Sequence, residues 1–346
     1  MRKAIFVMVL IAAFTIPVGA LEIVAPDPPE DAQELIQTQT SDFGADLWKL
    51  VSGAIRKITP EFQSAAGVCA GVLGVVMLCA LLQTVPGCPD GMIRLGAVSA
   101  VAGLMLQQTG SMISLGAETV QSLSEYGKLL VPVMAGALAA QGGATSSTAL
   151  YGATAVFDAV LGSVTSAVLI PMAYLLLVMA VAAAASGEEV IKRIRELIQW
   201  GAIWFLKMVL YLFTGYIGIT GIISGTADAA ALKAAKITIS GMVPVVGGIL
   251  SDASEALLVG VGVMKSGAGI YGMLAIVAIC VTPFFQIGIR YLMLKLTAAA
   301  CTVFDVKGAA EVVRDFSSVM GLLLGVTGTM CMILLISVVA FMKGVG

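Results

Sequence analysis

The sequence predicts an all-α polytopic membrane protein with about six transmembrane helices and two re-entrant or broken Pro/Gly segments. Of the 346 residues, 59% are hydrophobic and only 12% are charged, whereas soluble domains carry about 25% charged residues. The apolar residues form long runs, not the alternating segments of about ten residues that build a transmembrane β-barrel. The net charge of −2 gives no reason to expect nucleic acid as a partner.

Composition also argues against an enzyme. The chain contains no histidine, which removes histidine-based catalysis and most transition-metal sites. Residues 260–266 lack the spacing of a phosphate-binding loop, and no G-x-S-x-G motif is present. An intramembrane serine or aspartate mechanism would remain, but no nucleophile–base pair is suggested by spacing. We therefore expect no catalytic residues, no cofactor and no metal.

The amino-terminal region divides at about residues 20 and 61. Residues 1–20 combine Arg2 and Lys3, an apolar run and a small-residue ending at Ala20, which is typical of a signal peptide; an uncleaved first transmembrane helix is the alternative. Residues 21–61 form an acidic extracytoplasmic arm, expected to be mobile and solvated at its start. Within it, residues 47–58 have the spacing of an amphipathic helix that lies on the outer interface, with Trp48 at headgroup depth.

Residues 62–346 form the polytopic domain. The expected spans are residues 65–85, 95–116, a long one ending in 167–185, 201–225, 267–289 and 319–342. Gln107, Gln108 and Thr109 must face protein or water because lipid offers amides no partner. The polar residues 118–128, 188–197 and 290–318 connect the spans. By the positive-inside rule, the cytoplasmic basic residues are Arg94, Lys192, Arg193, Arg195, Arg290, Lys295, Lys307 and Arg314.

Two short apolar segments, residues 129–140 and 241–250, contain Pro132 and Pro244 and are too short to span a bilayer. Residues 131–138 and 243–250 are identical at five of their eight positions. This match suggests a parallel internal repeat, residues 129–225 and 241–342, with coincidence in a chain rich in Gly, Ala and Val as the alternative. Broken segments at matching positions in two repeats indicate a polar pathway at the middle of the membrane.

Polar groups at membrane depth are the candidate functional residues, because a charge there is costly. They include Asp158, Lys207, Asp252, Glu255, Gln286 and Lys295. Asp158 and Lys207 could neutralise one another, either as part of a proton or ion relay or as a structural pair. The six cysteines form no CxxC motif and are expected to be small buried hydrophobes. Our candidate pathway or assembly residues are Pro132, Gly136, Asp158, Lys207, Pro244, Gly247, Gly248 and Asp252.

Two runs resemble the stage III sporulation protein AE family: residues 236–258, KITISGMVPVVGGILSDASEALL, and residues 130–150, LVPVMAGALAAQGGATSSTAL. The resemblance implies a multi-pass protein of the mother-cell membrane that surrounds the forespore in endospore-forming bacteria. It further implies a non-enzymatic part of a secretion-like channel complex that supports forespore development and late forespore gene expression. The implied partners are other membrane proteins of the same sporulation operon, a secretion-type ATPase and extracytoplasmic ring proteins.

A second function class stays open on the residues alone. The candidate repeat, Asp158 and Lys207 would also suit a stand-alone secondary transporter or permease. In either case the lipid bilayer is the surrounding solvent, and a homo-oligomer is compatible with both readings.

Overall fold

The computed structural model describes residues 25–33, 43–86, 89–140, 144–219, 267–304 and 306–343, and in these ranges every regular element is a helix. The predicted all-α class is therefore confirmed. The elements are α2 (Glu30–Gln33), α3 (Phe43–Gln83), α4 (Asp90–Ala140), α5 (Ala144–Val164), the π-helix η1 (Thr165–Leu169), α6 (Ile170–Ser186), α7 (Glu189–Ile219), α10 (Gly267–Val303) and α11 (Lys307–Lys343).

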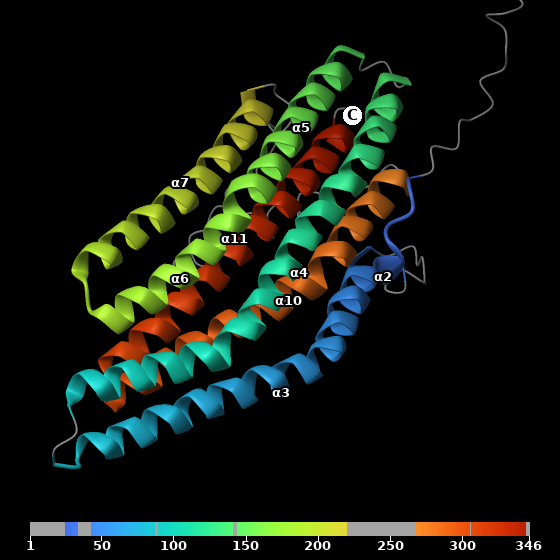
Figure 1. The fold of residues 1–346 in the computed structure, drawn as a ribbon. Helices are drawn as coiled ribbons and strands as arrows, with labels where there is room; N and C mark the ends of the chain where they lie inside the picture. The colour runs from blue at the N-terminus through green and yellow to red at the C-terminus, as the bar shows by residue number, and fades with distance from the viewer. Residues whose placement is uncertain are drawn as a thin grey trace, which may run out of the picture.

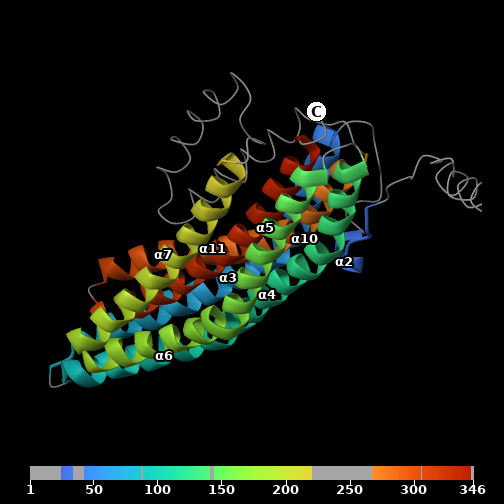
Figure 2. The ribbon, with the colours of Figure 1, turned by 90° about the horizontal axis from the view of Figure 1, so that it is seen from above.

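The helices form long antiparallel rods. Because α5, η1 and α6 follow one another without a break, they make one rod, residues 144–186, named here the α5–α6 rod. The turns between α3 and α4, α6 and α7, and α10 and α11 lie at one end of the bundle, at the lower left of Figure 1. The end of α4 and the start of α5 lie at the other end (Figures 1 and 2).

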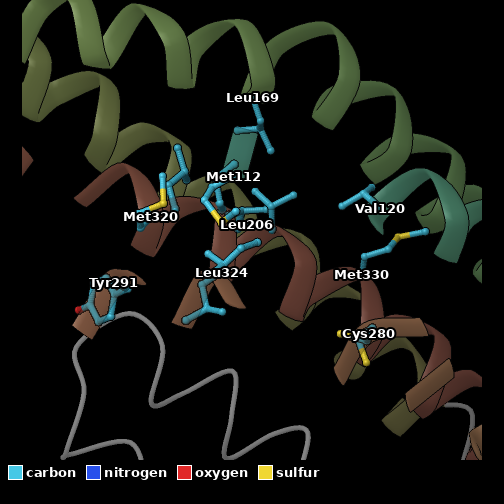
Figure 3. Close-up of a cluster of buried hydrophobic side chains, with 14 of the residues drawn as sticks. Met112, Val120, Leu169, Leu206, Cys280, Tyr291, Met320, Leu324 and Met330 are labelled. Carbon is cyan, nitrogen blue, oxygen red and sulfur yellow. The ribbon is translucent and has the colours of Figure 1, made fainter. Parts of the chain in front are cut away.

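Helix α11 is the core of the described bundle. It packs against α4, α5, α6, α7 and α10. In its most apolar 18-residue stretch 94% of the residues are buried, compared with 22% in that of α3. Met320, Leu324 and Met330 of α11 belong to one buried cluster with side chains from the surrounding helices, including Met112 and Leu169 (Figure 3). The rods α4, α5–α6, α7 and α10 therefore surround α11, while α3 packs against α4 and α10.

The outside of the bundle is rich in large apolar side chains. Examples are Leu78 and Leu81 on α3, which are each 63% exposed, and Trp200 on α7. Five helices among the described residues are long and apolar enough to cross a membrane: Asp46–Gln83, Tyr151–Ser186, Glu189–Tyr216, Gly269–Val303 and Gly308–Met342. An apolar exterior of this kind is what lipid requires, so the predicted membrane class agrees with the structure.

Helix α4 is not among those five, although residues 95–116 were expected to span. Its 51 residues include the polar stretches 107–109 and 118–128, which lower its mean hydropathy. At 1.5 Å per residue the helix is about 75 Å long, far more than the bilayer hydrocarbon core of about 30 Å. Along this length, the apolar residues 95–106 and 129–140 are separated by a more polar middle section.

The structure corrects the expected division into short spans and loops. Residues 118–128 lie in the middle of α4, and residues 129–140 are its last turns, not a separate re-entrant segment. Pro132 removes a backbone N–H and crowds the carbonyl of Lys128. Both residues are exposed, so the helix continues because this defect lies on its outer face and not in the packed interior.

The other predicted connections are helical as well. Residues 188–197 continue into α7, and residues 290–318 form the facing ends of α10 and α11. The tight corner between α6 and α7 is made by Gly187, whose φ of 75° is the left-handed conformation that glycine adopts without strain. Long helices and short turns thus replace most of the expected loops.

The described part of the acidic arm lies against the bundle, in contrast to the expected mobile segment. Ala25 and Ala32 are buried. The hydroxyl of Tyr271 on α10 donates to Asp27 Oδ1 at 3.1 Å, and that of Tyr126 on α4 donates to the carbonyl of Pro26 at 3.3 Å. These contacts hold residues 25–33 against α4 and the start of α10.

The predicted amphipathic helix is confirmed as a helix, but it is continuous with the first span. Both belong to α3, which contains Pro60 and bends along its length (Figure 1). Leu50, Ala54 and Ile58 are buried, while Trp48 is 70% exposed, as expected for a side chain at an interface.

Several predictions lie outside the described residues: the signal peptide, the arm residues 34–42, and the second broken segment with Pro244, Gly247, Gly248 and Asp252. Five cysteines are described, Cys69, Cys79, Cys280, Cys301 and Cys331, and each is free and buried. For these five the expected role as buried hydrophobes is confirmed.

Gly127 marks a close approach of α4 to α11, and this generates a stability prediction. A Cβ at Gly127 would lie 2.7 Å from Leu334 Cδ2, whereas one at Gly136 on the same helix would meet no atom within 4 Å. We expect Gly127→Val to lower the free energy of unfolding by about 1–3 kcal/mol, because overpacking forces neighbouring groups apart. Gly136→Val is the matched control and should leave stability unchanged or slightly higher, since valine favours helix over glycine.

The measurement is thermal unfolding of the two purified variants in the same detergent, followed by helical circular dichroism. Equal destabilisation of both variants would show that the α4–α11 approach at Gly127 is not tight.

Candidate functional site

Four of the eight candidate residues lie among the described residues, and the structure does not gather them at one place. Pro132 and Gly136 are exposed on the last turns of α4, and Asp158 is buried on the α5–α6 rod. Lys207 is exposed on α7, beside Gly325 and Thr329 of α11. Of these four, Asp158 is the one that is buried.

The expected pairing of Asp158 with Lys207 is wrong. The Asp158 carboxylate accepts a hydrogen bond from Ser124 Oγ on α4 at 3.0 Å, and Lys207 makes no ion pair within the described residues. The reason is the rotation of the α5–α6 rod. Phe157 packs edge-on against Phe213 of α7, with ring centroids 5.1 Å apart. Adjacent residues of a helix point in different directions, so Asp158 is turned away from α7 and toward α4.

Asp158 lines an open cavity of about 470 Å³ between α4 and the α5–α6 rod, in which polar side chains lie beside apolar surface. This volume falls within the range of small-molecule sites. We call it the α4–α5 cavity, and its lining residues are Ala117, Val120, Gln121, Ser124, Glu125, Lys128, Asp158, Ala159, Gly162, Ser163, Thr165, Ser166 and Ile170. Most are polar or small, in contrast to the apolar exterior of the bundle.

The polar lining of α4 follows directly from helical spacing. Gln121, Ser124, Glu125 and Lys128 are separated by three, one and three residues, so they share one face of the helix. This spacing was the signal that could have identified the site from the sequence. By polarity alone, residues 118–128 resemble a loop. The periodicity of their polar side chains instead indicates the polar face of a continuous helix.

The other wall of the cavity contains an irregular turn. In η1 the N–H of Ile170 donates to the carbonyl of Thr165, a π-type bond. Pro171 follows in the sequence; its missing N–H and bulky ring exclude a regular α-helical bond one turn earlier. The wider turn absorbs this defect and brings both Thr165 and Ser166 to the cavity. π-Bulges of this type occur frequently at functional sites.

Two buried polar atoms of the cavity wall have no hydrogen-bond partner in the described structure: Asp158 Oδ1 and Thr165 Oγ1. The other Asp158 oxygen is held by Ser124, and Asp158 as a whole is only 5% exposed. Buried polar groups are normally satisfied, and leaving one unpaired costs about 1–3 kcal/mol. The unpaired Asp158 oxygen therefore makes this cavity the candidate binding site of the bundle.

A second polar site joins α3, α4 and α10. Arg290 Nε donates to Glu61 Oε1 at 2.7 Å, and the same guanidinium bonds Gln108 of α4 and Ser64 of α3. Arg290 is 8% exposed and lies within α10, so the helix continues past residue 289, where the span was expected to end. The expectation that Gln108 faces protein is confirmed. A guanidinium between apolar helices requires such partners, and this need was the missed signal for Glu61.

Ion pairs also tie together the end of the bundle that contains the three short turns. Lys192 of α7 pairs with Glu311 of α11 at 2.9 Å, and Arg195 pairs with Asp315. Arg94 of α4 donates to the carbonyls of Ala185 and Ser186 at 3.1 and 3.2 Å, at the end of α6. The basic residues of these turns thus gather at one end, as the charge pattern predicts for a single side of the membrane.

The sequence matches a known protein family over most of its length. The family model described as stage III sporulation protein AE matches residues 31–344. The chain belongs to this family. The resemblance found in residues 130–150 and 236–258 is therefore confirmed, and the chain is a stage III sporulation protein.

A curated relative agrees with this assignment. The chain is 22% identical over 187 residues to the stage III sporulation protein AE of Bacillus subtilis (strain 168), a match that covers 54% of this chain and 47% of the relative. The matched region thus spans about half the length of that relative. No solved structure matches the chain.

The Arg290 site generates a prediction about coupling. Glu61→Gln should lower the free energy of unfolding by about 1–3 kcal/mol, because it leaves a buried guanidinium without its counter-charge. In the double variant Glu61→Gln with Arg290→Gln, the losses should be less than additive by about 0.5–3 kcal/mol. Chemical unfolding of the purified variants in mild detergent measures both quantities.

Glu118→Gln is the matched control, since Glu118 is an exposed carboxylate of α4, and it should change stability little. Strict additivity of the Glu61 and Arg290 losses would contradict the ion pair.

Proposed function

We propose that this sporulation protein is a non-enzymatic membrane component of a secretion-like channel complex that links mother cell and forespore. In this proposal it lies in the mother-cell membrane around the forespore and is required for forespore development and late forespore gene expression. The observation that carries the proposal is a cavity with polar side chains and a buried carboxylate, open at the outer surface of a bundle whose exterior is otherwise rich in apolar side chains. Polar groups of this kind at membrane depth face a partner or a water-filled space and not lipid.

The outer surface supports assembly with other membrane proteins. Helix α7 has large exposed apolar side chains along its length, including Trp200, Trp204 and Leu212. The rings of Trp200 and Trp204 stack at 6.4 Å. These residues suit contact with lipid or with transmembrane helices of partners. The partners we propose are the other membrane proteins of the sporulation operon, with a homo-oligomer as a further form of assembly.

Energy for transport would come from a partner. The sequence contains no phosphate-binding loop motif, so we propose that a secretion-type ATPase acts on the side of the membrane where the short turns and basic residues gather. Extracytoplasmic ring proteins would meet the opposite end, where residues 25–33 lie across α4 and α10. In this arrangement the bundle connects the two sides.

A stand-alone transporter is the second candidate, and the α4–α5 cavity favours it as well. A single buried carboxylate beside a cavity is also the type of site that transporters use. The structure removes one argument for it, because Lys207 does not pair with Asp158. The two functions differ in whether the chain acts alone.

The deciding experiment is purification of an epitope-tagged copy from sporulating cells in mild detergent, with identification of the co-purifying proteins. We expect the secretion-type ATPase and the ring proteins to be recovered at defined ratios, because a channel component is held by its siblings. As a control, the same tag on an unrelated multi-pass protein should recover neither.

Recovery of this chain alone, as a stable homo-oligomer from cells that express all the siblings, would overturn the channel proposal. The purified oligomer would then be tested for solute movement in liposomes.

The second broken segment, which lies outside the described residues, has its own test. We propose that Pro244, Gly247, Gly248 and Asp252 line the pathway or support assembly, so Pro244→Ala and Gly248→Leu should reduce the yield of heat-resistant spores. Gly136→Leu is the matched control because Gly136 has open space around it. Normal spore yield in both variants of the second segment would contradict this role.

A further inference from the structure

The α4–α5 cavity carries an inference that goes beyond the proposed function, since it concerns what the isolated chain binds. Its charged lining residues are Glu125, Lys128 and Asp158. Glu125 and Lys128 are exposed neighbours on one face of α4, and their opposite charges offset one another. With these two charges balanced, the negative charge of the buried Asp158 is the net charge of the cavity lining. The cavity as a whole therefore attracts positive charge.

The geometry of Asp158 also leaves one oxygen available. Ser124 Oγ donates its only proton to Oδ2 at 3.0 Å, while Oδ1 has no partner. A Cβ at Gly127 would lie 3.7 Å from Oδ1, so the glycine leaves room beside this oxygen. The χ2 torsion of aspartate is broad and roughly two-fold. Rotation about χ2 can therefore exchange the two oxygens without moving the helix.

The hydroxyl oxygens in the rest of the cavity wall indicate which kind of ligand it could bind. Thr165 Oγ1 has no hydrogen-bond partner, and Ser124, Ser163 and Ser166 contribute further hydroxyl oxygens. Oxygen ligands favour hard cations over transition metals. One buried carboxylate with neutral oxygens balances a single positive charge, whereas Ca²⁺ sites commonly use several carboxylates. The volume of about 470 Å³ also leaves space for part of a hydration shell, because a water molecule takes about 30 Å³ in the liquid.

We propose that the α4–α5 cavity binds a partly hydrated monovalent metal cation, Na⁺ or K⁺. The carboxylate of Asp158 and the Ser124 hydroxyl oxygen contact the ion. Thr165 lies about two helical turns further along the same rod and holds a water of the hydration shell through its free hydroxyl. The cation contacts the Asp158 carboxylate directly, whereas Lys128 of the same cavity wall forms no ion pair with it in the described structure.

The test is thermal unfolding of the full-length purified chain in detergent, followed by tryptophan fluorescence. Chloride salts of Na⁺, K⁺ and the bulky cation N-methyl-D-glucamine are compared at constant ionic strength. A ligand that binds only the folded state raises the unfolding temperature in a saturable way. We expect saturation with Na⁺ or K⁺ and none with N-methyl-D-glucamine; comparison of the two metal salts identifies the ion.

Two threonines of the same rod provide matched variants. Thr165→Val removes the free hydroxyl at the cavity, so it should raise the half-saturating cation concentration severalfold, at equal or higher stability in N-methyl-D-glucamine because a buried unpaired hydroxyl is lost. Thr154 lies outside the cavity lining and donates to Ser337 Oγ at 3.0 Å. Thr154→Val should lower the unfolding temperature in every salt and leave the half-saturating concentration unchanged. Asp158→Asn should abolish the cation dependence.

Identical unfolding temperatures of the unaltered chain in all three salts would overturn the proposal, and so would a cation dependence that persists in Asp158→Asn. If Asp158→Asn does not fold, direct binding of radioactive Na⁺ or Rb⁺ to the unaltered chain and to Thr165→Val decides instead. Equal binding by both chains would overturn it. Because this experiment uses no partner protein, its failure is distinguishable from failure of the proposed channel complex.

Discussion

The rest of the structure depends on the burial of α11 along its length. A buried helix surrounded by apolar rods must satisfy its own polar groups, and α11 does so locally. Thr327, Thr329 and Ser337 each donate to a carbonyl four residues earlier, at 3.0, 2.8 and 2.7 Å. The backbone of α11 thus takes up these three hydroxyl protons, while Ser317 donates to the carbonyl of Tyr291 on α10 and Ser337 accepts from Thr154 on α5. The rest of its buried surface is mainly apolar.

The charged groups of the bundle follow from the same constraint. Arg290 is paired where α3, α4 and α10 meet, and Asp315 of α11 is paired with Arg195 of α7. Each pair joins different helices, so an unpaired partner would be costly and the pair specifies which helices are neighbours. Asp158 is the contrast, since one of its oxygens has no partner. Arg195 also has one buried atom without a partner, its Nε, but its guanidinium is paired with a carboxylate. Among the described residues, Asp158 is hydrogen-bonded to a neutral hydroxyl alone, and this distinguishes it from the structural ion pairs.

Properties that depend on composition and local periodicity could be predicted from the sequence, and those that depend on the rotation of one helix against another could not. The helical class, the exposed Trp48, the buried cysteines and the inward-facing Gln108 follow from residue chemistry. The continuity of α4 was missed because residues 118–128 are polar, although their spacing indicates a helix face. The pairing of Asp158 could not be predicted, because it depends on Phe157 packing against Phe213, a contact between segments far apart in the chain.

The length and position of α11 have a mechanical consequence. Its 37 residues contain no proline, and at 1.5 Å per residue they form a strut of about 55 Å, longer than the bilayer core of about 30 Å. One end of this strut is clamped to α7 by ion pairs at Glu311 and Asp315. The other end reaches Met342, beside Gly269 at the start of α10. A force applied at the paired end would therefore move the whole helix as a stiff rod through the interior of the bundle. No proline kink interrupts this rod.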